Sequence, residues 1–170
     1  MKTSVIIFIN SFILTFTLNV ILSLNCYSQS DKYVEYYNNR FGFSFLYPNT
    51  FNTAEAPTNG DGQEFTSQDG QFYLISFGGN DNSFDYKSIK ERYSEDLLLY
   101  DEITYKKLFS DYYVLSGINK GEIFYIKKYV GEACINIIEM RYPIINKNDF
   151  NDIVTTISKS FKSGNLNESQ

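Results

Sequence analysis

The sequence predicts an α+β domain in which an antiparallel sheet of about seven strands is flanked by two helices. Three observations favour this fold class. Short apolar segments follow one another through tight turns, as in antiparallel hairpins. Two longer segments carry apolar residues at spacings of three and four, the period of an amphipathic helix. The segment 134–143 has apolar side chains on both faces, so a covering layer is expected on each side of the sheet.

The N-terminal residues have the pattern of a secretory signal peptide. A single early charge, Lys2, is followed by an apolar run to Leu24 and then by small and polar residues, which is the order found in such signals. The run approaches the length of a transmembrane anchor, the alternative interpretation, but Asn, Ser and Thr residues interrupt it. We expect residues 1–28 to be removed, with no membrane span left after processing.

Two modes of processing compete. Cleavage after Ser28 would leave Gln29 as the first residue. Alternatively, Cys26 could be lipidated as in bacterial lipoproteins, although Asn25 stands where their motif has a small residue. The sequence favours simple cleavage and predicts a secreted or periplasmic protein, with a lipoprotein as the alternative. A single domain over 29–162, a flexible tail over 163–170 and a monomer are expected.

The first half of the domain reads as three strands and a loop. Residues 40–48, RFGFSFLYP, place aromatic side chains on one face at period two and end at a proline, which predicts a strand. The segment 49–62 is rich in Asn, Thr and Gly and predicts a loop. Strands are then expected at 63–67 and 71–78, joined by a hairpin turn around Asp69-Gly70.

The second half reads as helix, four strands and helix. Asp85 is expected to cap a helix that ends near Leu99, with Phe84 packing on Ile89 as a hydrophobic staple. The expected strands are 103–109, 112–117, 122–130 and 134–143. In the last segment, capped by Asn148 or Asp149, a helical apolar stripe is formed by Phe150, Ile153, Val154, Ile157 and Phe161.

Composition excludes several kinds of chemistry. The formal net charge is −5, which argues against nucleic acid as a partner. The lysine pairs 106–107 and 127–128 are interpreted as solvated strand faces. The chain has no histidine, which removes Ser-His and Cys-His catalysis and the usual zinc sites. Cys134 has no adjacent basic cluster, so it is expected to be a buried, unreactive thiol.

The most motif-like segment is NGDGQEFTSQDG, residues 59–70. A calcium loop needs glycine at its sixth position and glutamate at its twelfth. Here those positions hold Glu64 and Gly70, so the segment is interpreted as two turns around a strand. No metal site, cofactor or catalytic residue is predicted. Because binding residues are often carried on loops, the candidate binding residues are Asn59, Gly60, Asp61 and Gly62.

The motifs RFGFSFLYP, NGDG and DG, together with a closing amphipathic helix after a strand that ends in RYP, resemble secreted bacterial proteins of the PsbP-like (DcrB-type) α/β/α sandwich fold. The resemblance covers nearly the whole mature chain. It implies an accessory or adaptor role, because members of this fold are mostly non-catalytic, and it supplies no catalytic residues.

The predicted function is therefore that of a secreted, non-enzymatic binding or accessory protein of the bacterial cell envelope. Its partner would be an envelope protein or polymer. One alternative is a small carboxylate-dependent glycan hydrolase, whose acid and base would come from Glu64, Glu122, Glu132 and Glu139. The other is a small-ligand carrier, which would need a large apolar cavity between sheet and helix.

Overall fold

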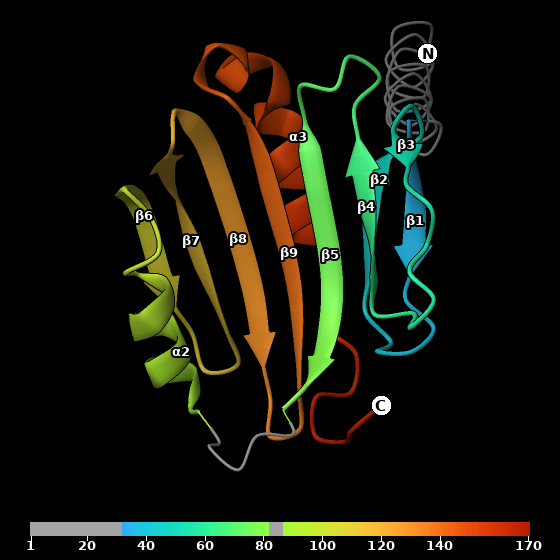
Figure 1. Cartoon of the computed structure of the whole chain (residues 1–170), viewed down its shortest axis with the longest axis vertical. Helices are drawn as coiled ribbons and strands as arrows, with labels where there is room; N and C mark the ends of the chain where they lie inside the picture. The colour runs from blue at the N-terminus through green and yellow to red at the C-terminus, as the bar shows by residue number, and fades with distance from the viewer. Residues whose placement is uncertain (1–31, 82–86) are drawn as a thin grey trace, which may run out of the picture. The chain divides into compact units, whose positions relative to one another are not determined.

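The computed structural model describes residues 32–81 and 87–170, arranged as in Figure 1. The strands are β1 (Tyr33–Tyr37), β2 (Ser44–Pro48), β3 (Asn52–Thr53), β4 (Gly62–Thr66), β5 (Tyr73–Asn80), β6 (Glu102–Leu108), β7 (Tyr112–Asn119), β8 (Glu122–Val130) and β9 (Cys134–Pro143). The helices are α2 (Ile89–Asp96), the 3₁₀ turn η1 (Ile144–Asn146) and α3 (Lys147–Ser160). The predicted signal peptide, the Asp85 cap and Phe84 lie outside the described residues.

The main sheet has seven strands in the order β3-β4-β5-β9-β8-β7-β6, and every neighbouring pair is antiparallel. This confirms the predicted α+β fold class. The last strand of the sequence, β9, is the central strand of the sheet, which is why both of its faces are apolar. The hairpin turn between β4 and β5 is also confirmed, with Gly70 at φ +67°.

The segment 40–48 differs from its prediction, because it supplies no strand to the main sheet. Gly42 has φ +69° and donates its backbone N–H to the Asn38 carbonyl, which forms a tight turn where an extended run was expected. Only β2 is extended, and it pairs with β1 in a separate two-stranded sheet. The two-residue β3, which pairs with β4 at the edge of the main sheet, brings the number of its strands to seven.

The first core lies between the main sheet, β2 and α3, the helix drawn behind the sheet in Figure 1. The predicted apolar stripe of α3 is confirmed, with Phe150, Val154 and Ile157 buried. The predicted caps Asn148 and Asp149 are wrong, because η1 leads the chain directly into a helix that begins at Lys147. The buried aromatic residues of this core are Phe41, Phe43, Phe45, Phe65, Phe72, Tyr142, Phe150 and Phe161.

The second core lies on the opposite face of the sheet, under α2. This helix begins at Ile89 rather than near Asp85, because Ser88 and Glu91 form a capping box. The predicted stripe is confirmed, since Ile89, Tyr93 and Leu97 pack against this core. The buried sheet residues of this core are Tyr113, Leu115, Phe124, Ile126, Val130 and Ile137.

The chain after α3 contacts β2 through Lys162, and within the predicted tail 163–170 it contacts the β8–β9 connection through Leu166. Lys162 and Ser44 exchange two backbone hydrogen bonds of 2.9 and 3.1 Å. The Leu166 carbonyl accepts from the backbone N–H groups of Ala133 and Cys134 at 3.0 Å. Residues Glu35–Gln170 cluster as one compact unit. In residues 32–81 and 87–170, no helix has both the length and the apolar character needed to cross a membrane.

Ile157 is fully buried at the centre of the α3 stripe, so Ile157→Asp would place an unpaired carboxylate in the first core. We expect this change to lower the free energy of unfolding by about 4 kcal/mol or more. Chemical denaturation of the purified protein measures the change. The control is Asn148→Asp, which adds the same charge at an exposed position of the same helix and should leave stability nearly unchanged. Equal stability of the two variants would contradict the docking of α3.

Candidate functional site

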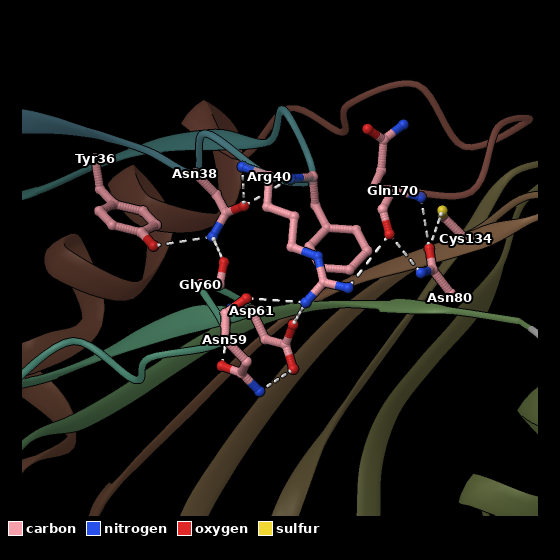
Figure 2. A network of polar contacts seen from close by, with 10 residues as sticks. Tyr36, Asn38, Arg40, Asn59, Gly60, Asp61, Asn80, Cys134 and Gln170 are labelled. Atoms are coloured by element: carbon pink, nitrogen blue, oxygen red, sulfur yellow. Dashed lines mark hydrogen bonds and ion pairs between the residues drawn. The ribbon is translucent and has the colours of Figure 1, made fainter.

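The predicted binding residues Asn59, Gly60 and Asp61 form part of a polar network (Figure 2). The Arg40 Nη1 group donates to the Asn59 carbonyl at 2.9 Å and to Asp61 Oδ1 at 2.6 Å. The second carboxylate oxygen of Asp61 accepts from Asn59 Nδ2 at 2.6 Å. Both oxygens of Asp61 are therefore engaged by neighbouring side chains.

The side chain of Asn38 holds this loop in place through hydrogen bonds. Its side chain is buried, and its Oδ1 accepts from the backbone N–H groups of Arg40 and Phe41 at 3.1 and 2.7 Å. Its Nδ2 donates to the Gly60 carbonyl at 3.0 Å and to the Tyr36 hydroxyl at 3.2 Å. Every hydrogen-bonding atom of the amide thus has a partner, which orders the loop against the turn before β2.

The network continues into the C-terminal residues (Figure 2). The Gln170 carbonyl accepts from Arg40 Nη2 at 3.3 Å and from Asn80 Nδ2 at 2.6 Å. The Cys134 thiol is fully buried and donates to the Glu168 carbonyl at 2.9 Å. Burial raises the pKa of this thiol, so Cys134 is a poor nucleophile at neutral pH, as the sequence predicted.

The two loop glycines have structural explanations. Gly60 has φ +69°, a left-handed conformation that side chains disfavour. A Cβ atom on Gly62 would lie 1.9 Å from the Ser76 carbonyl oxygen of the neighbouring strand β5. The loop also borders a small cavity of about 210 Å³, lined in part by Asn59, Asp61 and Gly62. A binding role for residues 59–62 stays a prediction.

The acidic residues considered for catalysis do not form one cluster, although Glu64 and Glu139 face the same side of the sheet. Glu122 and Glu132 lie at opposite ends of the β8–β9 hairpin. Glu139 forms an ion pair with Arg141 at 2.5 Å, and Glu64 lies two strands away from it, across Ile75. Within the described ranges, no group of three or more His, Cys, Asp or Glu residues is placed to hold a metal ion.

A second candidate site is a groove between α3 and the strands β6, β7 and β8, here named the α3 groove. It has one part of about 460 Å³ and an adjoining part of about 310 Å³. The two parts share Tyr105, Tyr125, Ser158 and Lys159, so they form one continuous depression. Their volumes lie in the range of small-ligand sites.

The walls of the α3 groove combine aromatic rings with hydroxyl groups. Tyr105 on the edge strand β6 is 50% exposed, and Tyr112 on β7 stacks on Phe109 with 4.2 Å between ring centroids. The Tyr125 hydroxyl is hydrogen-bonded to the Ser158 hydroxyl on α3, which ties strand and helix together at the floor. The remaining polar lining comes from Thr104, Ser116, Asn151 and Thr155.

Lys127 lies in the wall of the α3 groove and is only 8% exposed. Its ammonium donates to the carbonyls of Ser158 at 3.1 Å and Phe161 at 3.4 Å. It also lies 5.0 Å from the centroids of the Tyr112 and Tyr129 rings, which attract a cation through their electron-rich faces. Burial lowers the pKa of Lys127, an effect that the charge of Asp111 partly opposes.

The prediction that the pair 127–128 is solvated is wrong for both residues. Lys128 points to the α2 face, where it forms an ion pair with Asp96 at 2.5 Å, and Lys127 is buried on the α3 face. Lys106 and Lys107 are exposed, as expected. The sequence signal for the groove was the alternation of Tyr125, Lys127 and Tyr129 along one strand face, but the helix that completes the site comes from distant sequence.

Comparison with known proteins shows a likeness among solved structures. No protein-family model matches the sequence, and no curated protein matches it. Among solved structures, the chain is similar to the solution structure of cyanobacterial PsbP (CyanoP) from Synechocystis sp. PCC 6803, with a TM-score of 0.58 and 14% identity. The match covers 78% of this chain and 93% of that chain. The likeness concerns the fold alone, and it confirms the PsbP-like fold predicted from the sequence.

Proposed function

We propose that the protein is a non-enzymatic binding protein of the bacterial cell envelope, secreted or periplasmic, and that it holds a glycan chain in the α3 groove. The observation that carries the proposal is the lining of this groove, which combines aromatic rings with hydroxyl and amide groups. The groove is open and continuous, so a polymer can pass through it without threading.

Aromatic rings and hydroxyl groups together suit a sugar. One side of a pyranose ring carries C–H bonds that pack on a flat aromatic face, while the hydroxyls at its rim need hydrogen-bond partners. Tyr105 offers an exposed ring at the groove surface, and Asn151 and Thr155 offer an amide and a hydroxyl from α3. Such mixed linings, mostly apolar with a few placed polar groups, are typical of binding sites.

The two alternatives have less support. A retaining or inverting glycosidase needs two carboxyl groups about 5 to 9.5 Å apart around the scissile bond, yet no carboxylate lines either part of the α3 groove. A carrier for an apolar ligand would need an enclosed apolar cavity, whereas this groove is open and has polar side chains on both walls. Binding without catalysis accounts for both features.

The proposal predicts binding to soluble oligosaccharides without turnover. We expect at least one of six hexasaccharides to bind in isothermal titration: cellohexaose, chitohexaose, maltohexaose, oligogalacturonate, oligomannuronate and a heparin fragment. Tyr105→Ala should weaken that binding at least about fivefold, because it removes an exposed ring face. Chromatography of the mixtures should show no shortened products.

The control for the aromatic substitution is Tyr37→Ala. Tyr37 is 57% exposed but lies on β1, outside the groove lining, so its loss should leave affinity unchanged. Failure of all six probes to bind, or an equal effect of the two tyrosine substitutions, would contradict a glycan site in the α3 groove. Appearance of shorter oligosaccharides would support the hydrolase instead.

The loop 59–62 should not respond to calcium. Both carboxylate oxygens of Asp61 are hydrogen-bonded within the protein, and a cation would have to displace Arg40. We therefore expect millimolar calcium to leave the melting temperature unchanged, since only a ligand that binds the native state raises it. Differential scanning fluorimetry with calcium and with EDTA measures this. A rise of several degrees that Asp61→Ala abolishes would establish a cation site.

A further inference from the structure

We infer that the α3 groove selects acidic sugars, whose anionic groups are bound by Lys127, Lys147 and Lys159. This inference rests on the proposed function, because it names the chemical class of glycan for the same site. Its basis is the distribution of charge on the described residues.

The groove is locally basic in an acidic chain. The protein carries 20 acidic and 15 basic residues, yet the charged residues that line the two parts of the groove are Lys127, Lys147 and Lys159, without a carboxylate among them. Lys147 and Lys159 project from α3 on one wall, and Lys127 comes from β8 on the other. The Lys127 ammonium reaches the carbonyls at the C-terminal end of α3, so an anion in the groove would meet lysines from both the helix and the sheet.

These lysines are available to a ligand. The ion pairs found in the described part of the chain use Arg40, Lys87, Arg92, Lys128 and Arg141 as their cations. None of the groove lysines takes part in them. Lys147 and Lys159 are exposed, and their side chains can turn toward a bound anion without breaking an ion pair.

Lys127 supplies the most specific contact. An ammonium group has three donors, and the two described hydrogen bonds go to the carbonyls of Ser158 and Phe161. A third N–H is not used in these hydrogen bonds, and Lys127 lines the smaller part of the groove. The charge of Asp111 compensates this buried cation in part, but none of the ion pairs in the described residues includes Lys127. Because burying an incompletely paired cation is costly, an anionic group of the ligand would be held more strongly there than by a lysine in water.

A sugar fits this charge pattern better than a nucleic acid. Three lysines line the groove and neutralise few phosphates, whereas nucleic-acid binding draws its affinity from larger clusters of Lys and Arg. The aromatic rings and hydroxyl groups of the groove would bind the neutral parts of a saccharide, and the lysines would bind its carboxylate or sulfate groups. The expected ligand therefore alternates apolar ring faces with anionic substituents.

The deciding experiment compares ligands that differ only in charge. Hexagalacturonate and its fully methyl-esterified form share one backbone, and only the first is anionic. We expect the purified protein to bind the acidic form at least about tenfold more tightly in isothermal titration at low salt, a preference that shrinks as salt rises. Oligomannuronate and a heparin hexasaccharide test whether another carboxylated sugar or a sulfated sugar is the better anion.

Two double variants with equal change of net charge test the site. Lys147→Gln with Lys159→Gln should reduce affinity for the best acidic probe about tenfold or more, because charge-assisted hydrogen bonds are lost. Lys90→Gln with Lys106→Gln removes two exposed lysines outside the groove lining. This change should alter the affinity for the same probe by less than about twofold. Lys127→Met should reduce the preference for the charged over the esterified sugar, because one of the three lysines is lost. A melting curve of this variant checks that it is folded.

Each outcome separates this inference from the proposed function. Equal binding of acidic and neutral hexasaccharides, still sensitive to Tyr105→Ala, would overturn the selection of acidic sugars and leave the glycan site in place. Equal effects of the two lysine double variants would also overturn it, since the charge effect would then be non-local. Failure of all three acidic probes to bind would overturn it as well.

Discussion

The structure depends on a mismatch between the width of one helix and the width of one sheet. Seven strands about 4.8 Å apart span roughly 29 Å, whereas a helix with its side chains is about 10 Å wide. The α3 helix can therefore cover little more than β8 and β9, the strands of the main sheet that it contacts. The strand β2 packs beside α3 on the same core. The strands β6 and β7 lie beyond the width of α3, and their residues line the α3 groove.

The same geometry explains why two adjacent lysines have different roles. Successive side chains on a strand point to opposite faces, so β8 sends Lys127 toward α3 and Lys128 toward α2. On the α2 side a carboxylate is present, and Lys128 pairs with Asp96. On the α3 side the described partners of Lys127 are carbonyls and aromatic rings. One strand thus carries an ion-paired cation on one face and, on the other, a buried cation that takes part in none of the described ion pairs.

The parts of the fold that local sequence determines were predicted well. The bounds of β8 and β9 agree with the predicted segments 122–130 and 134–143, because short turns and apolar alternation mark both ends. The buried face of α3 follows from its period alone. The α3 groove could not be predicted in the same way, because it brings Tyr105 and Ser158 together from segments more than fifty positions apart.

Long-range contacts also decide where the sequence prediction was incomplete. The pattern of 40–48 gives the right buried aromatic residues, but a turn at Gly42 sends them to the layer of β2 rather than into the main sheet. The sequence favoured the loop 59–62 as a binding segment because loops often carry binding residues and because this loop is part of the most motif-like segment. In the structure its polar groups bond to Arg40 and Asn38, partners that sequence alone does not connect to it.

The two candidate sites differ in how far the protein satisfies its own charges. At the loop 59–62, Asp61 has Arg40 as a partner and both of its oxygens are used, so a ligand would have to compete with existing bonds. In the α3 groove, Lys147 and Lys159 take part in none of the ion pairs of the described residues. Breaking an internal bond costs about as much as a new one contributes, whereas an anion that meets free lysines replaces only water. Ligand binding is therefore favoured in the groove, at the opposite edge of the sheet from the loop.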